Sequence, residues 1–533
     1  DVMQIKKELY FFVFLGLILL ALFLRVYHLG TFSLFSDERS SVLLGVANTN
    51  QGGMGELMRP DKTFTPADFW APRGIKSWLD ADARGDVSGN SLVHDMMLKL
   101  FAWLFGKGDA AMRSVSVFFN MLTVWLMFRW GRQFSKANVW TLAIVFFAAI
   151  EPFYVIYSQQ ARNYATSLFF TTASNYLFWL LVIKRDGELN RNAKYLVLWV
   201  LASLGALFST YLTALALVGQ FVYLVFFVRD KSIWFRMSSR LVIVLLPFIA
   251  WFVWGPARYF MDFQANAADQ LLTYIKKNGE VPGWLEFATP SNLFKRTVSI
   301  VSDHFFWTND LYAKHGYKIG SILLLIFLFL VFQWIKSLDK AVRGIYVLGI
   351  IQIGLPVLFL FAAAVNAGTT SGFFLRYACF GLPFGIFISV GVFQYFLSQA
   401  IWYRIFACVF LLAQIYQLVQ LFTPLYSDQK QKYTFSVGRG PNPYPIIAAS
   451  IQAKYLPGDT VVYPSSKANL LDSKYLRNLV IDPLDAQNVN LYLNDTDSFI
   501  QRVDPYMQDS VLLKRKNGQV EVLFDFKNGK YRY

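Results

Sequence analysis

Long apolar stretches alternate with short polar ones from residue 10 to residue 423. A helix needs about 20 apolar residues to cross the hydrocarbon core of a bilayer, and most of these stretches approach that length. The pattern therefore predicts an α-helical polytopic membrane protein with about eleven transmembrane helices. The predicted spans lie near residues 10–28, 112–131, 138–156, 164–183, 195–210, 211–228, 241–257, 319–335, 344–366, 374–396 and 402–423.

The polar connections differ in charge on the two sides of the predicted membrane. Lysine and arginine gather in every second connection, and the positive-inside rule assigns these connections to the cytoplasm. The N-terminus is then cytoplasmic, and the opposite face receives the 29–111 loop, the 157–163 turn, the 258–318 loop and everything after Thr423. The basic residues that set this orientation are Lys6, Lys7, Arg129, Arg132, Lys136, Lys184, Arg185, Arg191, Lys194, Arg229, Lys231, Arg236, Arg240, Lys336, Lys340, Arg343 and Arg404.

Two segments of the outer loops have patterns of their own. Leu92–Phe105 is amphipathic, which predicts a helix along the membrane interface. The 258–318 loop carries aromatic residues among polar ones, and this mixture predicts a lid that rests on the membrane surface. The aromatic residues are Trp284, Phe287, Phe305, Phe306 and Trp307.

The composition changes to that of a soluble domain after residue 424, so we divide the chain into a membrane domain (1–424) and a small α/β extracytoplasmic domain (425–533). PIIAASIQAKYLPGDTVVYP predicts a helix, a turn and a strand, and 479–481 predicts a second strand. Two Asn-Gly turns, Asn517-Gly518 and Asn528-Gly529, predict a three-stranded meander at the end.

The composition supports a membrane protein and argues against a nucleic-acid partner. Of the residues, 55% are hydrophobic and only 16% are charged, whereas soluble chains carry about a quarter charged residues. The net charge of +16 is accounted for by cytoplasmic loops, so we expect no nucleic-acid partner. Cys379 and Cys408 both lie in apolar spans and indicate no disulfide framework.

Adjacent carboxylates, Asp37 and Glu38, follow the first span in the stretch LRVYHLGTFSLFSDERSS. The stretch also places Arg25, Tyr27 and His28 at the membrane boundary. A solvated acid pair is the simpler interpretation of such a loop. The residues where the other spans reach this face favour a functional site that includes the acid pair.

Arginines recur where later spans reach the same face. The boundary residues are Arg113; Glu151, Gln160, Arg162 and Tyr164 in EPFYVIYSQQARNYATSLFF; Arg258 and Tyr259; and Arg376 and Tyr377 in FFLRYACFGLPFG. A single arginine at a membrane boundary often only snorkels, so that its side chain reaches the interface and the residue has no further function. Several guanidinium groups near a carboxylate pair match the oxygens of phosphate, so the set predicts a site for an anionic lipid-linked ligand.

These motifs, with RSVSVFFNMLTVWLMFRWGRQF and in this order, resemble the GT-C glycosyltransferases over roughly residues 10–420, and the PGDTVV segment resembles a domain often appended there. The chain looks most like bacterial relatives of the protein O-mannosyltransferases and of the lipid A aminoarabinose transferase. The resemblance implies transfer of a sugar from a polyprenyl-phosphate donor to a protein, lipid or glycan acceptor. It implies the periplasmic face of a bacterial inner membrane, with the C-terminal domain in the periplasm. It further implies Asp37 as catalytic base, Arg162 and Arg376 near the carrier phosphate, and Tyr377 and Arg258 beside them.

The chain departs from that family at two motifs. Gln160 stands where many relatives have an acid, which removes a metal ligand, although Glu151 could reach the site. His94-Asp95-Met96 replaces a His-Pro-Pro motif, so His94 either touches substrate or packs an interface. His304, in the predicted lid, has the same two interpretations.

The donor is already activated, so the reaction needs a base for the acceptor hydroxyl and positive charge for the leaving phosphate. Asp37 supplies the base, and one base predicts inversion at the anomeric carbon. Glu38 positions the loop or the acceptor, and Tyr164, Gln160 and Glu151 are candidates for contact with substrate. We expect no cofactor, and a divalent metal is not favoured. A flippase of lipid-linked sugars is the alternative, but it predicts repeated halves and charges at mid-membrane. An envelope scaffold without catalysis would leave the acid pair unexplained.

Overall fold

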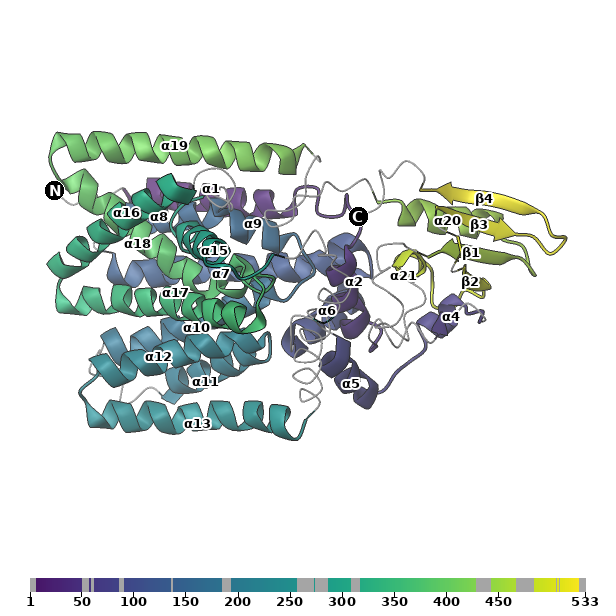
Figure 1. Ribbon diagram of the computed structural model, residues 1–533, viewed down its shortest axis with the longest axis horizontal. Helices are drawn as coiled ribbons and strands as arrows, with labels where there is room; N and C mark the ends of the chain where they lie inside the picture. The colour runs from purple at the N-terminus through teal and green to yellow at the C-terminus, as the bar shows by residue number, and fades with distance from the viewer. Residues whose placement is uncertain are drawn as a thin grey trace.

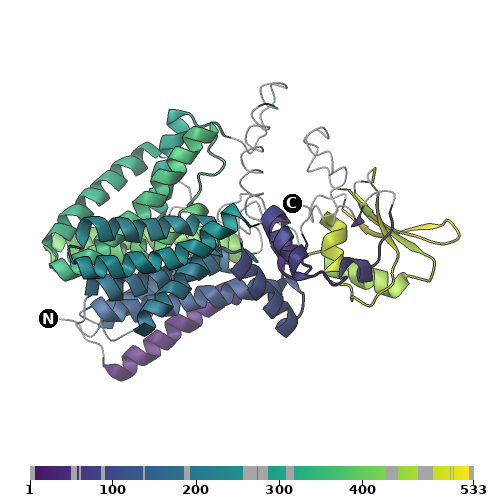
Figure 2. The ribbon, with the colours of Figure 1, turned by 90° about the horizontal axis from the view of Figure 1, so that it is seen from below.

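The chain forms a block of long helices at one end and a small sheet at the other, with short helices between them (Figure 1). The view from below has the same arrangement (Figure 2). The computed structural model describes residues 6–49, 57–58, 62–85, 91–135, 138–184, 193–255, 273, 286–307, 317–427, 442–465, 484–504, 506–507 and 509–526.

Every predicted apolar span coincides with a helix in the described part of the chain. Seven helices are long and apolar enough to cross a membrane, or eight if one bent pair counts as a span; three shorter apolar helices lie at further predicted positions. The polytopic prediction is confirmed. The helices are α1 (Lys7–Val26), α7 (Asp109–Phe134), α8 (Asn138–Ile150), α9 (Pro152–Ser158), α10 (Tyr164–Phe178) with its π-helical extension η1 (Trp179–Lys184), α11 (Ala193–Leu207), η3 (Tyr211–Thr213), α12 (Ala214–Phe227), α13 (Lys231–Val253), α16 (Tyr317–Ser337), α17 (Lys340–Ala367), α18 (Leu382–Ser398) and α19 (Ile401–Tyr426).

The outer helices of this block carry large apolar side chains on their surfaces. Phe12 of α1, Phe235 of α13 and Trp402 of α19 are 67%, 75% and 76% exposed. A soluble protein rarely exposes apolar surface on this scale, so these faces are suited to lipid.

The bent pair is α8 and α9, whose axes turn by 50°. Pro152 begins α9 and cannot continue the hydrogen-bond ladder of α8. The Glu151 carboxylate accepts a hydrogen bond from the N–H of Tyr154 and caps α9. The buried Arg25 donates to the carbonyls of Ala148 and Ala149 at the end of α8. The backbone groups left unpaired at the end of α8 and at the start of α9 therefore find hydrogen-bond partners inside the apolar block, where water is scarce.

Residues 305–307 do not form a surface lid as predicted, whereas Phe287 is 39% exposed and Trp284 lies outside the described residues. Phe306 and Trp307 are buried after α15 (Pro290–Asp303), and the N–H of Trp307 donates to Gln414 of α19. The chain reaches this depth because Gly385 of α18 has no side chain: a Cβ there would lie 2.0 Å from the carbonyl oxygen of His304. The prediction considered only composition, whereas the burial depends on this helix contact.

Short helices form the layer between the helical block and the sheet. They are α2 (Ser36–Gly45), α4 (Pro66–Phe69), α5 (Ile75–Gly85) and α6 (Leu92–Phe105). The predicted bounds of α6 are confirmed. Its Trp103 and Phe105 are exposed while His94, Asp95 and Leu98 are buried, so the exposed face of the helix is largely apolar and suits contact with lipid.

The C-terminal domain contains a mixed four-stranded sheet in the order β2-β1-β3-β4. The elements are α20 (Tyr444–Lys454), β1 (Thr460–Pro464), α21 (Leu484–Asn490), β2 (Gln501–Asp504), β3 (Ser510–Lys514) and β4 (Val520–Asp525). β1 pairs in parallel with β2, and the other pairs are antiparallel. The predicted helix, first strand and Asn517-Gly518 hairpin are confirmed; 479–481 and Asn528-Gly529 lie outside the described residues.

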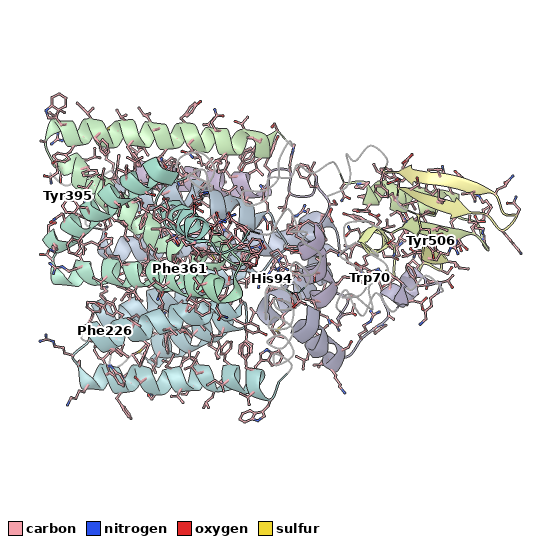
Figure 3. All side chains as sticks on the ribbon, viewed as in Figure 1. Trp70, His94, Phe226, Phe361, Tyr395 and Tyr506 are labelled. Atoms are coloured by element: carbon pink, nitrogen blue, oxygen red, sulfur yellow. The ribbon has the colours of Figure 1, made fainter. Side chains whose placement is uncertain are left out.

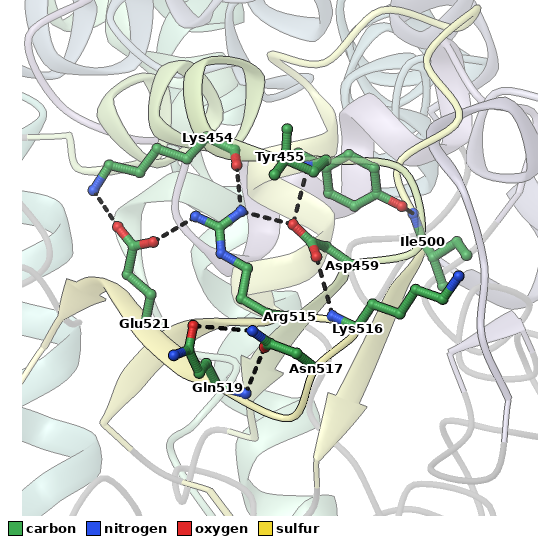
Figure 4. Close-up of polar contacts among 10 residues, drawn as sticks. Lys454, Tyr455, Asp459, Ile500, Arg515, Lys516, Asn517, Gln519 and Glu521 are labelled. Atoms are coloured by element: carbon green, nitrogen blue, oxygen red, sulfur yellow. Dashed lines mark hydrogen bonds and ion pairs between the residues drawn. The ribbon is translucent and has the colours of Figure 1, made fainter.

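A polar network fixes the β3–β4 hairpin to the end of α20 (Figure 4). Arg515 donates to the carbonyl of Lys454 and to the carboxylates of Asp459 and Glu521, each at 2.7 Å. Burial raises the pKa of Asp459, but hydrogen bonds from Leu456, Arg515 and Lys516 outweigh it and leave the pKa lowered.

The first outer loop contributes to the core of the C-terminal domain. Phe64 forms an antiparallel bridge with Gln501 at the free side of β2, and its ring is fully buried. Phe69 of α4 joins the same apolar cluster, and Trp70 donates from its indole nitrogen to the carbonyl of Asn490. The domain is therefore docked onto the membrane part through the loop that carries Asp37.

We predict that Gly385→Ala lowers the free energy of unfolding by about 1–3 kcal/mol, because the added methyl group must displace the backbone at His304. Thermal or SDS-induced unfolding in micelles measures the change. Gly354→Ala in α17 is the control, since nothing lies within 4 Å of a Cβ there. Equal stability of the two variants would contradict the contact.

Candidate functional site

Glu38 and Arg113 form a buried ion pair at the start of α2. Nε and Nη2 of Arg113 each donate at 2.9 Å to one carboxylate oxygen of Glu38, and both side chains are at most 2% exposed. Arg113 also donates to the carbonyls of Leu29, Phe32 and Ser33. The pair thus ties the chain between α1 and α2 to α7.

The Glu38 carboxylate has two further donors. It accepts a hydrogen bond from the N–H of Phe35, which caps α2, and one from the N–H of Ala161, at 3.1 and 2.8 Å. A carboxylate occupied by Arg113 and two N–H groups is poorly placed to accept a proton. These contacts favour the positioning role for Glu38.

The turn between α9 and α10 is held to α2 as well. Nη1 of Arg162 donates at 3.0 Å to the carbonyl of Asp37 and at 2.8 Å to the hydroxyl of Ser41. Gln159 donates to the carbonyl of Leu24 at the end of α1. The structure thus brings Arg162 close to Asp37, but Nη1 of Arg162 is bonded to the backbone carbonyl of Asp37 and not to its carboxylate.

The Asp37 side chain faces a different set of groups. It is half-buried and lies within electrostatic range of the Tyr164 hydroxyl, as do Arg162, Arg376 and Tyr377. The negative charge of Asp37 also stabilises the positively charged guanidinium group of Arg376. Residues from three separate parts of the chain, predicted from their place at membrane exits, therefore lie in one neighbourhood.

Arg376 lies on a short 3-10 turn, η5 (Leu375–Tyr377), just before α18. Its guanidinium carbon is 4.8 Å from the ring centre of Tyr377 and 5.4 Å from that of Phe374. These cation–π contacts hold the guanidinium group over two aromatic rings.

Two residues of the neighbourhood were not predicted. Arg296 of α15 lies 5.0 Å from the Phe374 ring, and its Nε donates at 2.9 Å to Glu286. The same carboxylate oxygen accepts from the hydroxyl of Thr370 at 2.6 Å. Glu286 and Arg296 belong to the predicted lid, and no motif there marks either residue.

His94 lies behind the 160–162 turn. Its ring is fully buried, and Nδ1 is 2.9 Å from the hydroxyl of Thr166. Burial, and then the positive charge of Arg162, lower the pKa of His94 to about 3. The imidazole is therefore neutral at physiological pH, and the packing interpretation is favoured.

The remaining predicted residues lie around this patch. Gln160 is 2% exposed, and its amide makes no hydrogen bond to the described residues. Glu151 caps α9 and lies near Arg25. His304 contacts the carbonyls of Ile300 and Ala378, so it supports the Arg376 segment from behind. Arg258 lies outside the described residues.

Other chemistry in the described residues is limited. No three His, Cys, Asp or Glu side chains converge as metal ligands among them. An apolar cavity of about 180 Å³ lies between α16, α18 and α19. Phe305, Phe306 and Trp307 line it directly after His304, so it begins close to the Arg376 segment.

Comparison with known proteins gives two similar solved structures. No family model and no curated protein sequence matches the chain. The crystal structure of ArnT from Cupriavidus metallidurans bound to undecaprenyl phosphate has 12% sequence identity and a TM-score of 0.45. The match covers 79% of this chain and 66% of that one, slightly less than two thirds of its length.

The structure of the same ArnT in the apo state has 13% identity and a TM-score of 0.49, over 91% of this chain and 84% of that one. This chain is similar to ArnT in structure. The similarity extends over most of its length at low identity.

We predict that Glu38→Gln lowers the free energy of unfolding by about 3–5 kcal/mol, because it leaves the Arg113 cation buried without its counter-charge. The double variant Glu38→Gln/Arg113→Met should recover much of the loss. SDS titration in micelles, followed by tryptophan fluorescence, measures both.

Arg502→Met is the control for this test. Arg502 lies 3.8 Å from Asp504 and is 38% exposed, so its loss should cost at most about 1 kcal/mol. A Glu38→Gln variant as mild as this control would show that the buried pair does not hold the site together.

Proposed function

We propose that the chain is a glycosyltransferase that moves a sugar from a polyprenyl-phosphate donor to an acceptor hydroxyl on a protein, a lipid or an envelope glycan. One observation carries this proposal: the half-buried Asp37 shares a patch with Arg376, while its neighbour Glu38 is bound by Arg113. A carboxylate and a guanidinium at a membrane boundary suit proton removal on one side and phosphate departure on the other.

The reaction needs only these two charges. Asp37 takes the proton of the acceptor hydroxyl as its oxygen attacks the anomeric carbon. The bond between that carbon and the phosphate oxygen breaks, and the polyprenyl phosphate leaves with the electron pair. Attack opposite the leaving group inverts the anomeric configuration. Arg376 stabilises the negative charge that develops on the phosphate.

The contacts support different roles for the two arginines. Nη1 of Arg162 is bonded to Asp37 and Ser41, which supports a role in orienting α2. Arg376 is held on ring faces, which supports the phosphate contact. Tyr377 and Tyr164 flank the same space, and we propose Arg258 as a further phosphate contact. The apolar cavity behind Trp307 suits part of the carrier's hydrocarbon chain.

We also propose the topology that the charge pattern predicts. Eleven helices span a bacterial inner membrane, the N-terminus is cytoplasmic, and Asp37 faces the periplasm. Residues 1–424 form the catalytic domain, and residues 425–533 form a periplasmic domain docked on the Asp37 loop. We propose no cofactor, since Asp37 acts as a base without a metal.

We predict that Asp37→Asn lowers the rate of sugar transfer by about 10²–10⁴-fold, because the amide keeps the shape of the carboxylate without its basicity. Transfer from polyprenyl-phosphate sugar by purified enzyme in nanodiscs measures the effect. A chelator should leave wild-type transfer unchanged. Loss of activity on chelation with recovery by one divalent ion would contradict the metal-free base, and an active Asn variant would exclude Asp37 as the base.

We predict that Arg376→Lys lowers the rate about ten-fold or more, equivalent to about 1.4 kcal/mol of barrier, because an ammonium group lacks the planar fork. Arg404→Lys, an exposed arginine at the other end of the helices, is the control. Near-normal turnover by the Arg376 variant would show that Arg376 does not bind the phosphate and only places a charge at the interface.

We predict that a reporter fused after Tyr533 is active only in the periplasm, because basic connections place the N-terminus inside. Paired fusions of a periplasm-active and a cytoplasm-active reporter test the orientation. Activity of the cytoplasmic reporter alone would put Asp37 on the wrong face for a periplasmic transferase.

A further inference from the structure

A second pocket lies at the end of the helical block opposite Asp37. It has a volume of about 280 Å³ and is lined where α7, α16 and α18 end and where α8 and α17 begin. Arg113, at the start of α7, and Arg376, just before α18, belong to the other end of the same helices. In Figure 3, Tyr395 of this pocket and His94 near the Asp37 site are far apart along the long axis.

Aromatic side chains from four helices form much of its wall. They are Trp140, Trp334, Tyr346 and Tyr395. Trp334 and Tyr346 are 5% exposed and meet edge to face, with ring centres 4.6 Å apart. Tryptophans and tyrosines at a membrane interface normally face the lipid head groups from the surface. These two are instead buried in the wall of a pocket.

A glycine makes room for this wall. A Cβ at Gly391 of α18 would lie 2.2 Å from Cη2 of Trp334 and 3.2 Å from the hydroxyl oxygen of Tyr346. The two rings can stand against α18 because residue 391 has no side chain. The aromatic surface is therefore a consequence of close helix packing.

One carboxylate, that of the exposed Asp339, lines the pocket at the protein surface. This residue occupies the N-cap position of α17, but its side chain makes no capping hydrogen bond. The hydroxyls of Ser135, Ser337 and Ser398 and the amide of Gln394 complete the polar part of the lining. Electron-rich ring faces with a carboxylate attract an organic cation.

Positive charge lies just outside the pocket. Nη2 of Arg343 donates at 2.8 Å to the carbonyls of Lys336 and Leu338, so its guanidinium lies at the backbone segment just before Asp339. Asp339 and Arg343 are both exposed, so a ligand with an ammonium group and a phosphate at the mouth of the pocket would match both charges. An anionic head group without an ammonium would meet the Asp339 carboxylate unfavourably.

We propose that this pocket binds the phosphoethanolamine head group of a membrane phospholipid, with the ammonium against Asp339 and the aromatic wall and the phosphate toward Arg343. The site is separate from the proposed transfer reaction. Its position at the ends of the helices suits a lipid of the leaflet opposite the Asp37 face.

Native mass spectrometry of the purified protein with added lipids tests this proposal. We expect phosphatidylethanolamine to bind about ten-fold more tightly than phosphatidylglycerol, and Asp339→Asn and Tyr395→Leu to remove most of the preference. Trp402→Leu is the control, because Trp402 is exposed at the same end and does not line the pocket.

Competition with glycerophosphoethanolamine distinguishes a lipid from a soluble source of the head group. Displacement only at great excess supports a phospholipid, and displacement at equal concentration supports the same head-group chemistry in a soluble ligand. Equal retention of the two phospholipids, or a preference that Asp339→Asn leaves unchanged, would overturn the proposal.

Discussion

The buried pair of Glu38 and Arg113 is the constraint on which the candidate site depends. Its cost is high, because two charges leave water, and only well-aligned hydrogen bonds can offset the lost hydration. Here the carboxylate has two guanidinium donors and two backbone donors, and the guanidinium also binds three carbonyls. The pair joins α2, α7 and the turn that carries Arg162. The hydrogen bonds of Arg162 to Asp37 and Ser41 of α2, and that of Ser116 of α7 to the Arg162 carbonyl, reinforce the same junction.

This anchor separates the roles of two acids that are adjacent in sequence. Consecutive residues of a helix point about 100° apart, so Glu38 faces α7 while Asp37 lies toward Tyr164 and Arg376. A second contact holds the Arg376 segment: His304 lies within hydrogen-bond distance of the carbonyl of Ala378, two residues after Arg376. The proposed base and phosphate ligand are thus supported from opposite sides, one by an ion pair and one by close packing against Gly385.

Much of this organisation could be predicted from the sequence. Apolar runs predict the helices because burial in lipid requires them to be long and continuous, and the arginines at membrane exits predict which residues share a face. The break at Glu151-Pro152 lies inside one predicted span, although Pro152 itself interrupts the helix there. The burial of Phe306 could not be predicted from apolar runs, because it depends on contacts between distant helices. The pairing of Glu286 with Arg296 has no periodic signal, and β2 was missed because its parallel partner β1 lies far away in the chain.

The central claim is that the patch around Asp37 makes a glycosidic bond and does not only move a lipid-linked sugar. Proteoliposomes that contain the purified protein and a polyprenyl-phosphate sugar, labelled in the sugar, test this directly when an envelope extract is added as acceptor. The account predicts that label becomes covalently attached to the acceptor and that one polyprenyl phosphate is released for each sugar transferred. Label that stays on its carrier while it crosses the bilayer would contradict the account and favour a flippase.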